Sequence, residues 1–236
     1  LRAIELNGVE TERNRQAFGW GRLAAADPEF LHASLNNDQR GDLGPESLED
    51  VIARRVDFLR DYQDEALAQK FHSLVSKVRD AESCVGGQLE LTESVARAYF
   101  KTLAYKDEYE VARLHTQTGF LSHLREQYGK AVKISFHLAP PLLGGKTDAR
   151  GRPRKRQFGP WIIPLFMMLA RMRRLRGTRF DLFGLTAERR LERALIGEFE
   201  QTVDSVLQSL TSNNISAATA IVNRYLDIRG YGPVKD

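Results

Sequence analysis

A regular hydrophobic period between Leu48 and Val78 constrains the fold more than any other feature of the sequence. Apolar residues recur there at spacings of three to five, and charged residues fill most of the positions between them. Such spacing places the apolar side chains along one face of a helix. Ser47 precedes the run as a candidate N-cap, and Gly86-Gly87 provides its end. We therefore predict one long amphipathic helix or two stacked ones, followed by a reversal of the chain.

Similar periods predict that most of the remaining chain is helical. Thr92 is expected to cap the next helix, and the Gly-Gly break before it favours an antiparallel hairpin. Residues 131–138 differ, because they partly alternate apolar and polar side chains, which predicts a strand with a partner near 156–159. The predicted fold class is mainly α, with long amphipathic helices in hairpin or bundle packing and a small β element near 131–138. Further helices are expected at residues 120–128, 161–175, 186–210 and 215–226.

The composition is that of a folded chain. Of its 236 residues, 42% are hydrophobic and 28% are charged, which is too apolar for a disordered protein. There is no run of about eighteen apolar residues, so no membrane span is expected. The single cysteine, Cys84, excludes an iron–sulfur cluster built from this chain alone. Since the sequence opens on Leu1 in helix-like residues, we expect residues 1–26 to end a preceding domain and residues 27–236 to form a mainly helical C-terminal domain.

Positive charge is concentrated in one window, Lys146–Arg179. Eleven Lys and Arg residues accompany a single acid there, Asp148, so the window carries +10. The whole chain carries +4, which leaves −6 for the remainder. A basic window on a mildly acidic body predicts a local surface that faces an anion.

Six strings along the chain resemble, in order, the corresponding parts of one protein family. They are Ala3–Val9 (AIELNGV) with Trp20-Gly21-Arg22, Tyr99–Leu114 (YFKTLAYKDEYEVARL), His137–Leu143 (HLAPPLL), Gln157–Trp161 (QFGPW), Leu175–Ile196 (LRGTRFDLFGLTAERRLERALI) and Ile228–Lys235 (IRGYGPVK). Together they resemble the C-terminal region of the fused-chain indolepyruvate ferredoxin oxidoreductases, a branch of the 2-oxoacid:ferredoxin oxidoreductases. The first string is similar to the end of that family's pyruvate-oxidoreductase-like gamma domain. The last departs at Pro233, where the family has His.

The resemblance implies an oxidative decarboxylation of an aryl 2-oxoacid to an acyl-CoA, with two electrons passed to ferredoxin. It places thiamine diphosphate and 4Fe–4S clusters in upstream parts of a parent chain. We expect neither cofactor here, because the sequence has no thiamine-diphosphate motif and one cysteine. The expected role is therefore non-catalytic and free of metal: to support assembly with the upstream domains, or the substrate or coenzyme A site, of a cytoplasmic enzyme.

The basic loop, residues 146–156, holds the main candidate binding residues. Its glycines would let backbone amides approach an anion. Phosphates could be bound by four basic side chains, those of Arg152, Arg154, Lys155 and Arg156. The resemblance offers coenzyme A or the acidic surface of ferredoxin as the anion, and a solvated or interdomain docking loop is the plain alternative. His137, at the end of the predicted strand, is a weaker candidate, since a His there is more often a structural hydrogen bonder.

The alternative function is that of an autonomous module that binds nucleic acid or another polyanion, because a basic window is typical of such proteins. The window has no helix-turn-helix pattern, zinc ligands or RNA-recognition signature, which makes nucleic acid the weaker hypothesis. The sequence leaves open whether the chain forms a homo-oligomer.

Local spacing gives three further expectations. The carboxylates of Lys106–Glu110 are interpreted as helix-surface pairs or an interdomain contact, with Glu110 facing Arg113. Arg173 and Arg176, three apart, are expected to share a face and to extend the positive field. Core filling is the expected role of the methionines in the apolar helix, Met167, Met168 and Met172.

Overall fold

The structure is a computed structural model that describes residues 2–7, 11–27, 29, 46–129, 133–138 and 155–228. The chain divides into two compact units, residues 1–47 and 48–236, and each is described by itself. In the first unit, helix α1 (Arg2–Asn7) is followed by α2 (Thr11–Ala26), which buries none of its side chains. The expected domain limit at residue 26 is the end of α2, whereas the division between the compact units lies at Ser47.

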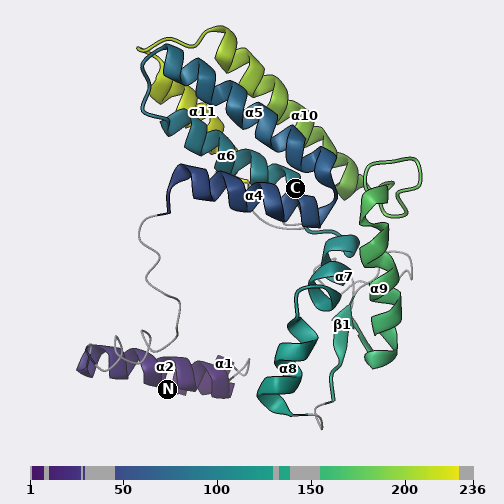
Figure 1. The fold of residues 1–236 in the computed structure, drawn as a ribbon. Helices are drawn as coiled ribbons and strands as arrows, with labels where there is room; N and C mark the ends of the chain where they lie inside the picture. Colours follow the sequence, from purple (N-terminus) through teal and green to yellow (C-terminus); the bar gives the residue numbers. More distant parts are fainter. Residues whose placement is uncertain are drawn as a thin grey trace. The chain divides into compact units, whose positions relative to one another are not determined.

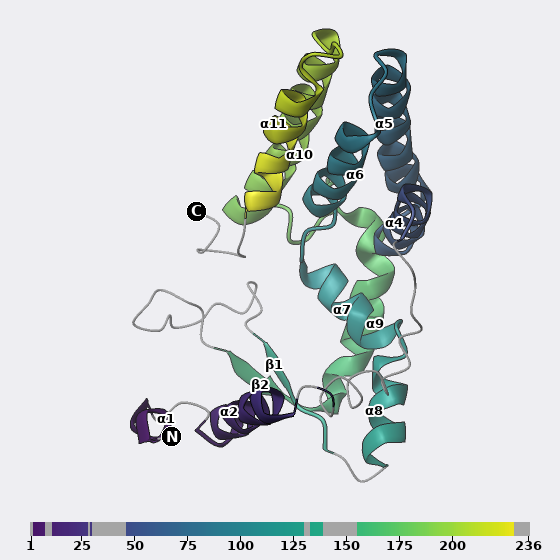
Figure 2. The same ribbon diagram turned by 90° about the vertical axis from the view of Figure 1, so that its left-hand side faces the viewer.

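Five helices of the second unit form a bundle in which α6 is central. Helix α6 packs against each of the other four, as Figures 1 and 2 show. The hydrophobic period from Leu48 forms two helices and not one, because the chain turns after Tyr62 and Asp64 caps the next helix. The Asp64 carboxylate accepts the backbone N–H of Leu67 at 2.9 Å. The five helices are α4 (Leu48–Tyr62), α5 (Glu65–Cys84), α6 (Glu90–Leu103), α10 (Ala187–Gln208) and α11 (Ile215–Asp227).

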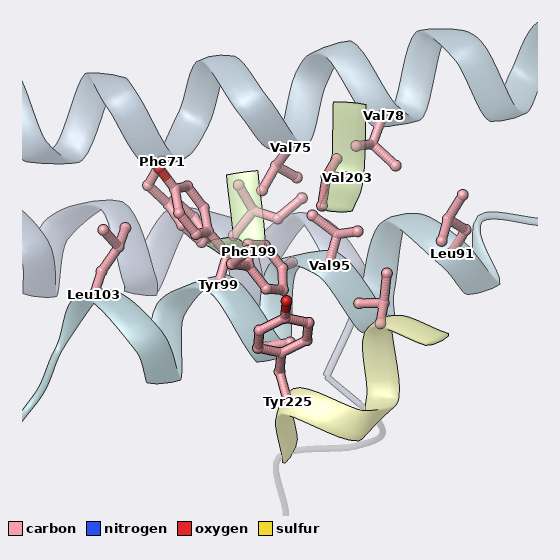
Figure 3. Close-up of a cluster of buried hydrophobic side chains, with 14 of the residues drawn as sticks. Phe71, Val75, Val78, Leu91, Val95, Tyr99, Leu103, Phe199, Val203 and Tyr225 are labelled. Carbon is pink, nitrogen blue, oxygen red and sulfur yellow. The ribbon is translucent and has the colours of Figure 1, made fainter. Parts of the chain in front are cut away.

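A series of aromatic rings runs through the core of the bundle (Figure 3). Phe71 of α5 stacks on Tyr99 of α6 with ring centroids 6.0 Å apart, and Tyr99 stacks on Phe199 of α10 at 5.2 Å. Tyr225 of α11 meets Phe199 edge-on at 4.9 Å. Such pairs contribute about 0.5–1.5 kcal/mol each beyond their burial. One continuous ring contact therefore joins four helices of the bundle.

A second, smaller hydrophobic cluster lies at the other end of this unit (Figure 1). Ala112 and Ala170 are fully buried where α7 packs on α9, and their small side chains allow the two helices to approach closely. His115 lies among phenylalanine rings of this cluster, stacked on Phe166 at 5.5 Å, and burial together with nearby Lys106 lowers its pKa. The elements of the cluster are α7 (Glu108–Thr116), α8 (Phe120–Tyr128), β1 (Phe136–Leu138), β2 (Arg156–Phe158), the 3-10 helix η2 (Pro160–Ile162) and α9 (Ile163–Arg171). The 3-10 helix η3 (Met172–Leu175) follows α9.

The two strands form a small antiparallel ribbon. Phe136 lies opposite Phe158, and Leu138 lies opposite Arg156. The predicted β element and its partner near residues 156–159 are thus confirmed, with the described strand limited to residues 136–138. The mainly α fold class is confirmed as well. Among the described residues, no helix combines the length and the apolar character that a membrane crossing requires.

The reversal between α5 and α6 depends on the buried carboxylate of Glu82. Helix α6 starts after Leu89, whose side chain provides no cap. Instead, Glu82 Oε1 accepts the N–H of Leu91 at 3.1 Å, and Oε2 accepts both the N–H and the hydroxyl of Thr92, at 2.8 and 2.7 Å. The expectation that Thr92 caps this helix is therefore wrong. Thr92 lies inside the first turn as a donor, and the preceding helix supplies the acceptor.

Two glycines make this reversal possible. Gly86 has a φ of 77°, which an L side chain rarely adopts, and it ends α5 as the sequence predicts. A Cβ on Gly87 would lie 2.4 Å from Cγ of Glu82. Gly87 is therefore the residue that lets the carboxylate reach the start of α6.

Replacing Glu82 with Ala is expected to lower the free energy of unfolding by about 2–4 kcal/mol, because two buried N–H groups and one hydroxyl lose their acceptor. Urea unfolding followed by circular dichroism measures this change. Asp80→Ala, at an exposed position of the same helix, serves as the control and should stay within about 0.5 kcal/mol. Equal effects of the two substitutions would contradict the capping role.

Candidate functional site

A buried ion pair between Asp107 and Arg176 connects the two hydrophobic clusters. Arg176 donates through Nε to Asp107 Oδ2 at 2.6 Å and through Nη2 to Oδ1 at 2.9 Å. Both side chains are almost completely buried, with 2–3% of their surface exposed. Asp107 Oδ1 also accepts the N–H of Glu110, so the same carboxylate caps α7. The pair therefore fixes the start of α7 against the end of η3.

Tyr62, the last residue of α4, completes the surroundings of Arg176. The guanidinium lies 3.7 Å from the centre of the Tyr62 ring and donates through Nη1 to the Tyr62 carbonyl at 2.9 Å. The Tyr62 hydroxyl donates to the carbonyl of Tyr105 at 2.7 Å. Burial opposes the charge on Arg176, but the hydrogen bonds to Asp107 together with the electrostatic attraction of Asp107, Tyr62 and Tyr105 outweigh burial and raise its pKa. The bundle and the second cluster are thus held together by one cation that makes three hydrogen bonds and one cation–π contact.

Two more buried ion pairs lie around this centre. Arg113 donates to both oxygens of Glu110, at 2.8 and 2.9 Å, so the predicted pairing is confirmed. Its predicted place on the helix surface is wrong, because both side chains are about 92% buried. Arg189 of α10 donates to Glu192 and lies 3.8 Å from Glu108. Burial raises the pKa of Glu108, with Arg189 opposing the shift.

Asp181 organises the segment between η3 and α10. We call residues 177–186 the Asp181 loop. Asp181 Oδ1 accepts the Tyr109 hydroxyl at 3.2 Å and the N–H groups of Phe183 and Gly184 at 3.2 and 3.0 Å. Its Oδ2 accepts the N–H of Gly177 at 2.8 Å. One carboxylate from the loop therefore holds both ends of the loop and anchors them to α7.

Neighbouring residues tighten this arrangement. Phe183 points inward and packs edge-on against Tyr109, with ring centroids 5.1 Å apart. The carbonyl of Gly184 accepts from Arg193 of α10 at 2.5 Å. A Cβ on Gly184 would lie 2.6 Å from the Asp181 carboxylate, so a side chain there would disturb the loop. Thr186 ends the loop and caps α10, which confirms the predicted start of that helix.

The same loop carries apolar side chains that face solvent. Phe180 is 75% exposed, Leu182 is 50% exposed and Leu185 is 85% exposed. Exposed arginines precede, occupy and follow the loop, and no described residue pairs with them: Arg174, Arg179 and Arg190.

The residues predicted to bind an anion are only partly described. Arg152 and Arg154 lie outside the described residues. Lys155 and Arg156 are exposed at the start of β2, and His137 is exposed on β1 opposite Gln157. His137 and Arg156 thus belong to the same ribbon, but they occupy alternate positions of the pairing and face opposite sides.

Two expectations about the basic window need correction. Arg176 does not extend a positive surface with Arg173, because it is buried against Asp107, while Arg173 donates to Gln117 at 3.0 Å. Met167 and Met168 are not core filler, since they are 46% and 48% exposed. With Met172 and Arg171 they line an open hollow of about 440 Å³ along α9 and η3. The core face of α9 instead holds Phe166 and Ala170.

The chemistry of the buried network is that of a structural connection. The carboxylates of Asp107, Glu110 and Asp181 each accept hydrogen bonds at both oxygens. Burial raises the pKa of Tyr105 to about 12 and that of Tyr109 to about 12, so both hydroxyls stay protonated near neutrality. Among the described residues, no three His, Cys, Asp or Glu side chains form a group that could hold a metal ion.

Sequence reasoning missed Asp107, Arg176 and Asp181 as the organising residues. The available signal was that they belong to the two longest of the six strings, Tyr99–Leu114 and Leu175–Ile196. Spacing within either string carries no information about contacts between them.

These features define a helical unit in which two clusters are connected by buried ion pairs. Residues 48–236 match a family described as a family of unknown function (DUF6537). The chain belongs to this family, whose match begins at the first residue of the second compact unit. No curated protein and no solved structure matches the chain in the corresponding searches.

Replacing Arg176 with Met is expected to lower the free energy of unfolding by about 3–5 kcal/mol, because it leaves the Asp107 carboxylate buried without its cation. Arg174→Met removes an exposed arginine two residues away and should change stability by no more than about 0.5 kcal/mol. Urea unfolding of both variants gives the comparison. A loss below about 1 kcal/mol for Arg176→Met would show that the pair does not hold the clusters together.

Proposed function

We propose that this chain is the non-catalytic C-terminal region of an indolepyruvate-type 2-oxoacid:ferredoxin oxidoreductase. The parent enzyme would convert an aryl 2-oxoacid to an acyl-CoA and reduce ferredoxin in the cytoplasm. Within it, this region would support assembly with the upstream domains or complete the substrate or coenzyme A site.

One structural observation supports the proposal beyond the sequence resemblance itself. The two longest resembling strings, Tyr99–Leu114 and Leu175–Ile196, meet in space through Asp107–Arg176 and Tyr109–Asp181. Residues about 70 positions apart in the chain therefore build one buried network. The two strings that carry most of the resemblance thus build the same structural centre of the second unit.

The distribution of polar groups supports a non-catalytic role. The central carboxylates accept from partners within the network, which leaves them engaged in holding the fold. A 4Fe–4S cluster requires four cysteine ligands, and this chain has one, Cys84, exposed at the end of α5. The residues present do not fit such a cluster, so the clusters and thiamine diphosphate of the parent enzyme would belong to other regions.

The proposal is tested on the longest natural chain that contains this region. That protein, purified anaerobically, is expected to reduce ferredoxin with indolepyruvate and coenzyme A, while residues 1–236 alone give no turnover. A parent chain without a thiamine-diphosphate domain, or one inactive on aryl 2-oxoacids, would overturn the assignment. Retention of residues 1–236 on DNA with a steep salt dependence would favour the polyanion-binding alternative.

In the same enzyme, replacing Arg152, Arg154, Lys155 and Arg156 together with Ala is expected to raise KM for coenzyme A or for ferredoxin. Both partners are anionic, and removing four cations weakens their attraction and its salt dependence. Steady-state kinetics at several ionic strengths measure the change. Unchanged KM values for both partners in a folded variant would assign the basic loop to solvent or to packing.

A further inference from the structure

The Asp181 loop is held both by its own carboxylate and by contacts with neighbouring helices. Its backbone N–H groups at Gly177, Phe183 and Gly184 all donate to one carboxylate, and that carboxylate is bound to α7 through Tyr109. Arg176, immediately before the loop, is fixed by Asp107. The loop is therefore held at both ends and in its middle.

A loop held in this way cannot withdraw its apolar side chains from water. Phe183 occupies the inward position against Tyr109, so Phe180, Leu182 and Leu185 remain outside. Isolated exposed apolar residues are common on proteins, but here three lie within six positions of one loop, which we call the apolar patch of the loop. Rigid presentation of aromatic and aliphatic side chains is what protein-binding surfaces use, because little conformational entropy is lost on binding.

Charge indicates what kind of surface fits this patch. Arg174, Arg179 and Arg190 surround the loop in sequence, and no described residue pairs with them. The neighbouring acid Glu188 already lies 3.7 Å from Arg189. Exposed apolar side chains accompanied along the chain by these arginines complement a partner segment that combines apolar side chains with carboxylates.

The same charges argue against two other occupants. A symmetric contact with a second copy of the chain would bring like arginines together across the two-fold axis. Binding to anionic lipid through charge generally uses clusters of about four to eight cations beside a hydrophobic anchor, more than the three at this loop.

We propose that the Asp181 loop is a protein-docking element, in which Phe180, Leu182 and Leu185 pack against apolar side chains of a partner segment that also carries Asp and Glu. Arg174, Arg179 and Arg190 pair with those carboxylates. This interaction does not depend on the enzymatic assignment of the parent chain, since it rests on the loop alone.

The test begins with a displayed library of random peptides, selected on purified residues 1–236. The expected binders combine aromatic or aliphatic residues with Asp and Glu. Their affinity, measured by fluorescence anisotropy with the synthetic peptides, should fall by at least about tenfold in the variant Phe180→Ser/Leu185→Ser. The matched control is Ile221→Ser, which changes a residue 48% exposed on α11 and should leave the affinity within about twofold.

A charge-reversal variant tests the arginines separately from the apolar side chains. Arg174→Glu/Arg179→Glu/Arg190→Glu should also weaken these peptides by at least about tenfold and should bind peptides in which Lys replaces the acids. Unfolding midpoints of all variants should match the parent chain, because each substituted side chain is exposed.

Four results would overturn the proposal. The first is a selection that yields no binders, and the second is a set of binders without acidic residues. The third is peptide affinity unchanged in the Phe180→Ser/Leu185→Ser variant. The fourth is loop-dependent binding elsewhere, either to vesicles of anionic phospholipid or between two copies of the chain in sedimentation equilibrium.

Discussion

The bidentate pair of Asp107 and Arg176 is the interaction on which the second unit depends. Burying two charges is costly, and the cost is recovered only when geometry and further hydrogen bonds satisfy both partners. Here the Arg176 fork meets both carboxylate oxygens, a carbonyl and an aromatic face, and Asp107 caps α7 in addition. A hydrophobic replacement could fill this volume, but it would not determine the angle between the bundle and the second cluster. The pair thus orients the bundle and the second cluster as well as joining them.

The consequences of this pair extend along the chain in both directions. At its Asp107 end, it places Tyr109 in the first turn of α7, where the hydroxyl reaches Asp181. Downstream, it positions Gly177, the first donor to that same carboxylate. The conformation of the Asp181 loop therefore depends on an ion pair outside it as well as on its own carboxylate. Phe183 takes the inward position against Tyr109, while Phe180, Leu182 and Leu185 are exposed.

Elements that depend on local sequence could be predicted, and those that depend on distant partners could not. The period after Leu48, the reversal at Gly86 and the start of a helix near residue 186 are local, and each agrees with the structure. Thr92 has the chemistry of a cap, yet Glu82, ten residues earlier, performs that role from another helix. Local spacing puts Arg176 beside Arg173, and a carboxylate 69 residues away removes it from the surface.

Runs of apolar residues also limit what the sequence can predict about the core. Helix α9 is apolar on nearly all sides, so its period does not select a core face, and Met167 and Met168 prove to be exposed while Phe166 is buried. Likewise, the candidate anion-binding residues of the basic loop stay predictions, because the described part of that loop is limited to Lys155 and Arg156.

Amide hydrogen exchange in an Arg176→Lys variant tests most directly whether this ion pair fixes the loop. Lysine keeps the charge but loses the planar fork. Protection of the N–H groups of Gly177, Phe183 and Gly184 is predicted to fall by at least about tenfold, while that of Leu91 and Thr92 at the Glu82 cap is retained. Unchanged protection of the loop amides in the folded variant would contradict the account.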